Sequence, residues 1–427
     1  MSLEAESYIP PLSIHRENTL LKYFHRVLEL PDNTRIVSEI KDNFESLIAK
    51  PYSSVILKPL CVRANELIRQ LGLEPPKFIN VPLISPLSPM IDKANIFHSD
   101  FYDIPLSRLS DDMVRQNFLF MKENTYAQHL EIYTDGSVFS TPEQSCSSAF
   151  VIKSNINTTM QNFRLPKEYS ILQCEFHAIE SALEFIKTNN ILSSPIVIYT
   201  DSKCSIQALK NPLSKCNLYY IYKIHQLIHF ILRRTSIHLQ FVPGHRDIEG
   251  NELADLAAKA GHNNQFMEGI VIPREAKVRY VQPVLLRKWE RYWHQNVLIS
   301  GKGRHMKNVK QRLVKWEWAC NKNRTIETVF AKLRIGHVNT AEHLHRFNLA
   351  PSPFCACGNY DNVYHIFMQC PNYEGKRQIL RNNFRTINVD FNVRSMLGGG
   401  PYDLATQYKI VGLVANFLNA IGRLNRL

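Results

Sequence analysis

The tetrapeptide Ile-Tyr-Thr-Asp occurs twice in this sequence, and each copy ends a short apolar run typical of a β-strand. The first copy ends at Asp135 and is followed by Gly136-Ser137; the second ends at Asp201 and is followed by Ser202. If the two strands are parallel neighbours in one sheet, both carboxylates lie at its carboxyl edge, where α/β sheets bind ligands. Adjacent carboxylates repel each other, and hard oxygen donors suit Mg²⁺ or Mn²⁺. The repeat therefore predicts a metal site.

Two further acids occur in predicted helices. Glu175 lies on the apolar stripe of a helix over 172–187, where an unpaired carboxylate would be costly to bury. Asp255 lies in an alanine-rich helix over 249–259, whose small side chains permit close approach to a sheet. Taken singly, each of the four acids is better explained as a helix cap or a surface charge.

The surrounding pattern predicts an α/β fold in which one mixed sheet is covered by helices. Hairpin strands come first and strand–helix alternation follows. Strands are expected at 129–134, 146–153, 158–165, 195–200 and 237–242, and helices at 172–187, within 202–233 and at 249–259. Three more helical patterns, over 17–30, 35–50 and 61–73, predict a helical N-terminal unit.

The order of these acids resembles the ribonuclease H family, as it appears in the polyproteins of non-LTR retrotransposons. The motifs TDGS, TDS, Pro243-Gly244-His245 and, over 250–255, GNELAD all match it. The resemblance implies a ribonuclease H-like, mixed five-stranded sheet with flanking helices over 112–262. Many members have glycines where this chain has Ser147, Ser148 and Ala149, and an apolar helical segment replaces a basic protrusion before His245. Hybrid binding is therefore expected to draw on other parts of the chain.

The resemblance also implies an activity, namely metal-dependent hydrolysis of the RNA strand of RNA–DNA hybrids. Asp135, Glu175, Asp201 and Asp255 would hold two Mg²⁺ (or Mn²⁺) ions, which promote in-line displacement at phosphorus. His245 would assist proton transfer or product departure, because imidazole titrates near neutral pH. The rival hypothesis is a non-catalytic nucleic-acid-binding remnant or domesticated protein. Four intact acids favour the enzyme.

A cysteine/histidine cluster near the C-terminus has the spacing of a structural zinc site. Cys355, Cys357, His365 and Cys370 form C-x-C-x7-H-x4-C, a complete tetrahedral set for one Zn²⁺. The alternative is reduced cysteines in a degenerate remnant. The nine cysteines are odd in number and scattered, which argues against a disulfide framework. The cluster resembles the zinc knuckle that follows ribonuclease H in some non-LTR elements.

Most of the formal net charge of +13 comes from residues 287–315, where nine basic residues accompany one acid. Lys302, Arg304, Lys307 and Lys310 surround two glycines and are predicted to contact nucleic acid. Trp289, Trp293, Trp316 and Trp318 bracket the segment and suit base stacking. The alternative is that the tryptophans pack in a helical core while the lysines are simply solvated.

These features divide the chain into five predicted segments. Residues 1–74 are a helical unit and a candidate remnant of a reverse transcriptase thumb, and 75–111 are a Pro-rich linker. The ribonuclease H domain (112–262), a basic helical connector (263–345) and the zinc knuckle with C-terminal helices (346–427) follow. A reverse transcriptase encoded upstream is a candidate partner. The chain lacks an apolar run long enough to span a membrane and opens with acidic residues, which predicts a protein of the nucleus or cytoplasm that is neither secreted nor membrane-bound.

Overall fold

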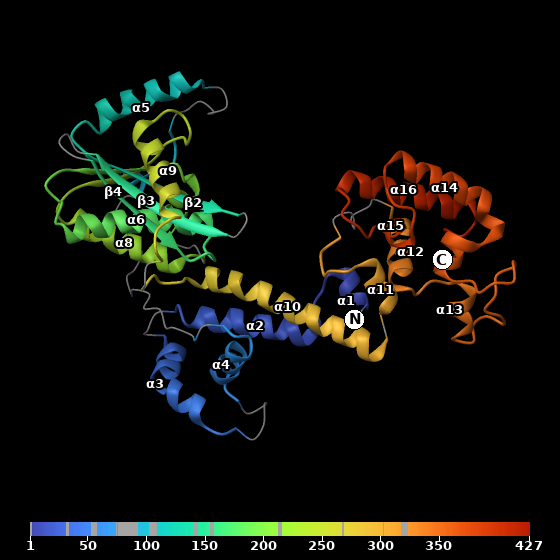
Figure 1. Cartoon of the computed structure of the whole chain (residues 1–427). Coiled ribbons are helices and arrows are strands. Elements are labelled where there is room, and N and C mark those ends of the chain that lie inside the picture. The colour runs from blue at the N-terminus through green and yellow to red at the C-terminus, as the bar shows by residue number, and fades with distance from the viewer. Residues whose placement is uncertain are drawn as a thin grey trace. The chain divides into compact units, whose positions relative to one another are not determined.

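A computed structural model shows two compact units, one formed by residues 18–282 and the other by residues 1–17 together with 283–427 (Figure 1). Each unit is considered by itself. The structure describes residues 2–30, 34–52, 58–73, 75, 93–101, 109–140, 144–153, 158–211, 216–266, 269–301, 303–316 and 323–427.

The unit of residues 18–282 contains a six-stranded mixed sheet with the order β1-β6-β5-β2-β3-β4. The strands are β1 (Phe97–His98), β2 (Leu130–Phe139), β3 (Ser145–Lys153), β4 (Thr158–Leu165), β5 (Ile196–Thr200) and β6 (Ile237–Phe241). β2, β3 and β4 form an antiparallel meander, whereas β5 pairs parallel with both β2 and β6. The predicted α/β class and the five predicted strands are confirmed. β1 adds a sixth from within the predicted linker, because Phe97 is fully buried against the sheet core.

Helices cover both faces of the sheet (Figure 1). Successive side chains along each central strand point to opposite faces, so they pack against different helices. Ile132 and Ile198 lie in the core formed with α6 (Ile171–Thr188) and α8 (Leu218–Leu232). Their neighbours Tyr133 and Tyr199 lie in the core formed with α5 (Asp111–Thr125) and α9 (Glu249–Gly261). The sheet is therefore covered on both faces, which accounts for the nearly continuous apolar character of β5.

The start of α6 is determined by its sequence. The Ser170 hydroxyl accepts from the Gln173 backbone N–H at 3.3 Å, and the Gln173 side chain accepts from the Ser170 backbone N–H at 2.9 Å. This reciprocal pair is a capping box, which satisfies two backbone donors that a helix start leaves open. It sets the position of Glu175, five residues after Ser170.

Helical segments complete both units. Residues 18–282 contain most of α2 (Leu12–Val27), the first part of α10 (Arg274–Ser300), and α3 (Arg35–Ala49), α4 (Leu60–Gln70) and α7 (Lys203–Lys210). The three predicted N-terminal helices correspond to α2, α3 and α4. The other unit contains α1 (Ser2–Ser7), the second part of α10, α11 (Arg304–Val309), α12 (Arg324–Ile335), α13 (Ala341–His345), α14 (Glu374–Thr386), α15 (Val393–Met396) and α16 (Leu404–Ala420). Among the helices described, none has the length and apolar character needed to cross a bilayer.

Candidate active site and candidate zinc centre

Three of the predicted acids converge beside the central strands. The register of β2 and β5 places Thr134 opposite Thr200, so that Asp135 and Asp201 follow at the same level. Glu175 approaches from α6, and one carboxylate oxygen of each of the three lies within 4.8 Å of the other two. Asp135 and Glu175 are buried, with exposures of 6% and 5%. The structure thus gathers three carboxylates at a mostly buried position.

Asp255 and His245 form a second group with Glu252, and one ligand atom of each lies within 4.8 Å of the others. His245 follows β6 in a loop and has a left-handed backbone conformation, with φ of 54°. The Lys259 ammonium contacts Asp255 at 2.6 Å, one turn along α9. The fourth predicted acid therefore lies outside the three-carboxylate group, although its charge reaches Asp135.

The electrostatics of the three acids reflect crowding of negative charge. Burial, with the charges of Asp201 and Asp255, raises the pKa of Asp135 to about 8. Burial and the same kind of repulsion raise the pKa of Glu175 well above its usual value. Burial also raises the pKa of Asp201, while the Asn251 amide and His245 oppose that rise. A nearby cation would relieve this cost.

The donor set fits a hard divalent cation. Glu175 Oε2 is buried and, within the described residues, accepts no hydrogen bond. A buried carboxylate oxygen without a donor is costly, and three converging carboxylates supply the oxygens that Mg²⁺ and Mn²⁺ prefer. The residues present therefore fit the predicted metal.

Two glycines permit the close approaches on which this geometry depends. A Cβ at Gly136 would lie 2.7 Å from the backbone nitrogen of Glu175, so a larger residue there would push β2 away from α6. A Cβ at Gly244 would lie 2.5 Å from Oδ2 of Asp201. Gly244, in the motif Pro-Gly-His, therefore leaves room for the Asp201 carboxylate.

We expect the substitution Gly244→Ala to weaken Mg²⁺ binding by about 10- to 100-fold, the range typical of altered support around a metal ligand. The added methyl group must displace the Asp201 carboxylate from its present position. Titration calorimetry with Mg²⁺ on the full chain measures the change. Gly375→Ala is the matched control, because a Cβ there meets no atom within 4 Å. An unaltered affinity in Gly244→Ala would contradict this role of Gly244.

Three residues of α9 that border the site were not predicted from the sequence. The Asn251 amide nitrogen lies 3.5 Å from Asp201 Oδ2, Glu252 joins the group with His245, and Lys259 pairs with Asp255. A signal was present: Asn251, Asp255 and Lys259 recur every fourth residue and so share one face of a helix.

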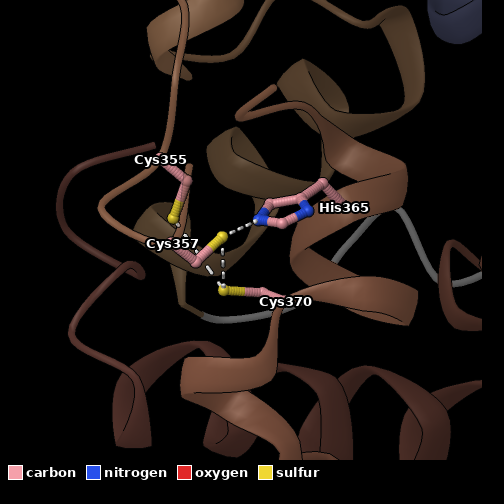
Figure 2. Close-up of side chains that lie close together, drawn as sticks. All are labelled: Cys355, Cys357, His365 and Cys370. Carbon is pink, nitrogen blue, oxygen red and sulfur yellow. Dashed lines mark hydrogen bonds between the residues drawn. The ribbon is translucent and has the colours of Figure 1, made fainter. Parts of the chain in front are cut away.

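The predicted zinc ligands also converge, in the unit that contains the C-terminus (Figure 2). Two of the contacts join sulfur atoms: Cys355 Sγ lies 3.8 Å and Cys357 Sγ 3.9 Å from Cys370 Sγ. Nε2 of His365 lies 3.2 Å from Cys357 Sγ. The cysteines are free thiols, since a disulfide would need about 2.05 Å.

These separations fit tetrahedral coordination. With Zn–S of about 2.3 Å and Zn–N of about 2.0 Å, tetrahedral ligands lie roughly 3.8 Å apart for two sulfurs and roughly 3.5 Å apart for sulfur and nitrogen. The sulfur separations agree, and the sulfur–nitrogen contact is slightly shorter. Three thiols and one imidazole are the chemistry of a structural zinc site, so this donor set fits Zn²⁺.

Local groups adjust the protonation of the ligands. A hydrogen bond from the backbone at Asn359 lowers the pKa of the Cys357 thiol. Burial raises the pKa of Cys370 to about 11, and burial lowers the pKa of His365. The imidazole is therefore held in the neutral form that binds metals. The Cys370 thiol, by contrast, would lose its proton only when a metal ion binds.

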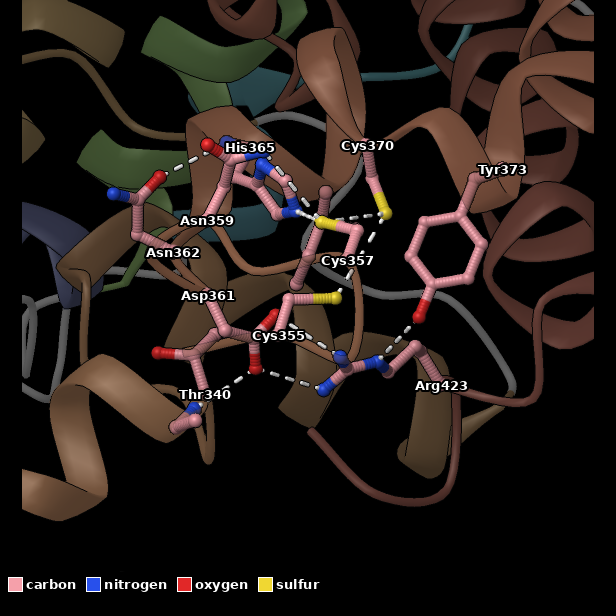
Figure 3. A network of polar contacts seen from close by, with 12 residues as sticks. Thr340, Cys355, Cys357, Asn359, Asp361, Asn362, His365, Cys370, Tyr373 and Arg423 are labelled. Carbon is pink, nitrogen blue, oxygen red and sulfur yellow. Dashed lines mark hydrogen bonds and ion pairs between the residues drawn. The ribbon is translucent and has the colours of Figure 1, made fainter. Parts of the chain in front are cut away.

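Polar contacts attach the cluster to the rest of its unit (Figure 3). Asp361 lies in the segment between Cys357 and His365, here called the ligand loop. It accepts hydrogen bonds from the Arg423 guanidinium at 2.9 and 3.1 Å and from the Ala341 backbone N–H at 2.9 Å. The Arg423 Nε–H donates to the Tyr373 hydroxyl at 3.2 Å. Arg377 donates to the Cys370 carbonyl at 2.7 Å and is 1% exposed. Residues distant in the sequence thus hold the ligand loop in place.

The basic segment differs from its prediction. Lys310 is buried: its ammonium donates to the Ala5 carbonyl at 2.7 Å and lies over the Trp316 ring, and burial lowers its pKa to about 8. Its assignment as a nucleic-acid contact is therefore wrong. Arg304 is exposed, Lys307 is half-buried, and Lys302 lies outside the described residues.

The prediction that bases stack on the tryptophans is also wrong for three of the four rings. Trp289, Trp293 and Trp316 are 3%, 0% and 7% exposed, because they pack in the core of their unit. The alternative of a helical core therefore holds for these three. Trp318 lies outside the described residues.

Comparison with known proteins identifies one part of the chain. Residues 127–263 match the family model described as RNase H, and this span contains all five predicted catalytic residues. No curated protein matches the chain.

Solved structures with a similar fold include a prototype foamy virus protease–reverse transcriptase, with 19% identity over 32% of this chain and a TM-score of 0.28. That match spans 21% of the viral chain. The RNase H1 of the archaeon Halobacterium salinarum matches at 18% identity over 31% of this chain and 96% of its own, with a TM-score of 0.26. The foamy virus RNase H domain matches at 20% identity over 32% and 94%, with a TM-score of 0.27. On the family match, residues 127–263 of this chain form an RNase H domain.

Proposed function

We propose that this chain is a Mg²⁺-dependent endonuclease that hydrolyses the RNA strand of RNA–DNA hybrids. The observation that carries the proposal is the convergence of Asp135, Glu175 and Asp201 within 4.8 Å at a mostly buried position. The RNase H family match over the same residues supports the substrate class, and the general use of divalent metal ions in this family supports the metal.

Each residue near the site has a role in this proposal. Asp135, Glu175, Asp201 and Asp255 would hold two Mg²⁺ ions, which supply an activated water and stabilise the leaving oxygen. Asn251 orients Asp201 through its amide, and Lys259 holds Asp255 by their ion pair. His245, on the loop beside Asp255, exchanges a proton with the attacking or leaving oxygen.

The direct test uses the full-length protein and an RNA–DNA hybrid labelled on the RNA strand, with Mg²⁺ or with EDTA. We expect RNA cleavage with Mg²⁺ and none with EDTA, and no cleavage of the same RNA annealed to RNA. Binding of the hybrid without cleavage under either condition would contradict the proposal and support the rival, a non-catalytic nucleic-acid-binding protein.

The substitution His245→Ala should slow hybrid cleavage by about 10²-fold without abolishing it, a typical contribution of one general acid–base. Water or buffer replaces a proton carrier, whereas a metal ligand has no such substitute. Single-turnover rates measured from pH 5 to 9 report the effect, and imidazole added to the assay should restore part of the rate. His229→Ala, an exposed histidine on α8, is the control. A complete loss of cleavage in folded His245→Ala would assign His245 a larger role.

We also propose that Cys355, Cys357, His365 and Cys370 hold one structural Zn²⁺. The sulfur separations of 3.8 and 3.9 Å, together with the ion pair of buried Asp361 with half-buried Arg423 beside them, support a preformed site. All four positions are filled by protein ligands, so the metal would stabilise the fold without taking part in catalysis.

We further propose that the chain derives from a non-LTR retrotransposon polyprotein and acts with a reverse transcriptase encoded upstream. The order of an RNase H domain followed by a Cys₃His cluster supports this origin. Such an enzyme would act where hybrids form, in the nucleus or cytoplasm. Co-purification of the chain with the polymerase of its own element tests the partnership.

A further inference from the structure

The exposed face of α10, in the unit that contains the C-terminus, has a positively charged pocket. Arg287, Glu290, Arg291 and His294 line it. Arg287, Arg291 and His294 are spaced at i, i+4 and i+7, so they lie on one side of the helix. The residues that α10 buries form another stripe, made of Val284, Leu285, Trp289, Trp293 and Val297. The buried stripe fixes which way the pocket residues point.

Among the described residues, the two arginines of this pocket have no anionic partner. In the described part of the chain, neither Arg287 nor Arg291 makes an ion pair or a hydrogen bond. Other basic side chains of the unit form ion pairs: Lys288 pairs with Glu17 at 2.6 Å, and Arg423 pairs with Asp361 at 2.9 Å. Lys288 and Arg423 thus have carboxylate partners within the fold, whereas Arg287 and Arg291 have none among the described residues.

A third basic residue, Lys307, lies beside the pocket, against the lining residue His294. The Lys307 ammonium contacts the His294 ring and lies 4.6 Å from the centre of the Trp293 ring, which holds it by a cation–π interaction. The one acid that lines the pocket, Glu290, already accepts from the Leu313 backbone N–H at 3.2 Å. Arg287 and Arg291 in the lining, with Lys307 beside it, therefore outnumber the single carboxylate, which already accepts a backbone hydrogen bond.

We propose that this pocket binds phosphates of a nucleic-acid strand. Arginines four residues apart are about 6 Å apart along a helix, and a strand carries one phosphate per nucleotide. The planar guanidinium matches a phosphate with two parallel hydrogen bonds, which favours arginine over lysine at such sites. The identity of the polyanion rests on the proposed function, since the RNase H domain of the same chain would take a nucleic acid.

The test measures binding of the full-length protein to a labelled RNA–DNA hybrid and to single-stranded RNA in EDTA, so that cleavage does not interfere. Two lost phosphate contacts should flatten the slope of log affinity against log salt by about 1.4 to 1.8. The same arithmetic gives a loss of affinity of roughly 15- to 30-fold near 0.15 M salt for Arg287→Gln with Arg291→Gln. Fluorescence anisotropy between 0.05 and 0.3 M salt gives both values.

The matched control is Arg312→Gln with Lys315→Gln, which removes two exposed charges of the same segment outside the pocket lining. An unchanged slope in the pocket variant, or an equal change in both variants, would overturn the proposal. Loss of binding to phosphatidylserine vesicles with nucleic-acid binding intact would overturn it too, by assigning the pocket to a membrane. Circular dichroism checks that both variants fold.

A cleavage assay separates this proposal from the proposed function. If the wild-type protein binds hybrids with the expected slope but does not cleave them, the nuclease assignment fails and the pocket stands. If the pocket variant keeps kcat and only its KM rises, both stand. If the wild-type protein cleaves hybrids and the pocket variant binds with the wild-type salt slope, the pocket proposal fails and the nuclease assignment stands.

Discussion

Replacing Asp201 with asparagine should reduce Mg²⁺-dependent hybrid cleavage at least about a hundredfold, a loss of about 2.7 kcal/mol or more of transition-state stabilisation. The substitution keeps the shape of the side chain and removes the charge that faces Asp135 and Glu175. Because Asp201 contributes to the raised pKa of Asp135, the variant should be at least as stable as the wild type without metal. Its affinity for hybrids in EDTA should change little.

Three measurements together make this test specific. Single-turnover cleavage reports the chemistry, thermal unfolding with and without Mg²⁺ reports metal binding, and anisotropy in EDTA reports hybrid binding. Mg²⁺ should raise the melting temperature of the wild-type protein but not that of the variant. Asp112→Asn, an exposed carboxylate on α5, should behave like the wild type. Wild-type cleavage by Asp201→Asn would refute the carboxylate site.

Loss of zinc is the second large effect that we expect. Purified protein should contain about one zinc per chain, and Cys355→Ser should lose most of it, because a three-ligand remnant binds weakly. Structural zinc contributes directly to folding free energy, with apparent values of about 10–16 kcal/mol in zinc-finger peptides. Protease cleavage should therefore appear around residues 350–375 in the variant and in chelator-treated protein.

The control and the counter-result are both available in this chain. Cys204→Ser replaces an exposed free cysteine outside the cluster and should retain the metal. Arg423→Gln should keep all four ligands but weaken zinc binding about 10- to 100-fold, because it leaves Asp361 buried without its guanidinium partner. A metal-free protein from cells that resists protease at 350–375 would contradict the zinc proposal. Hybrid cleavage by the separate RNase H domain should persist in Cys355→Ser.

The sequence alone determined the α/β class, the five longer strands and the acids that could meet. Two strands with the same ending, Ile-Tyr-Thr-Asp, predict one sheet edge, and the observed register of β2 and β5 agrees with this. The convergence of the three cysteines and the histidine was predictable because these residues are close in the chain. In both cases the signal is local: strand periodicity and ligand spacing follow from backbone geometry.

The tertiary structure alone decided which basic and aromatic residues are buried. The basic character of their segment favoured exposure of Lys310 and Trp316 on the surface. In the structure, however, the Lys310 ammonium donates a hydrogen bond to the carbonyl of Ala5, 305 residues away. The room that Gly244 leaves for Asp201 likewise depends on a contact between distant segments. The same packing leaves Arg287 and Arg291 exposed, without an ion pair among the described residues, because α10 buries its tryptophan face. Burial depends on contacts between residues remote in the chain, and the composition of a segment does not contain them.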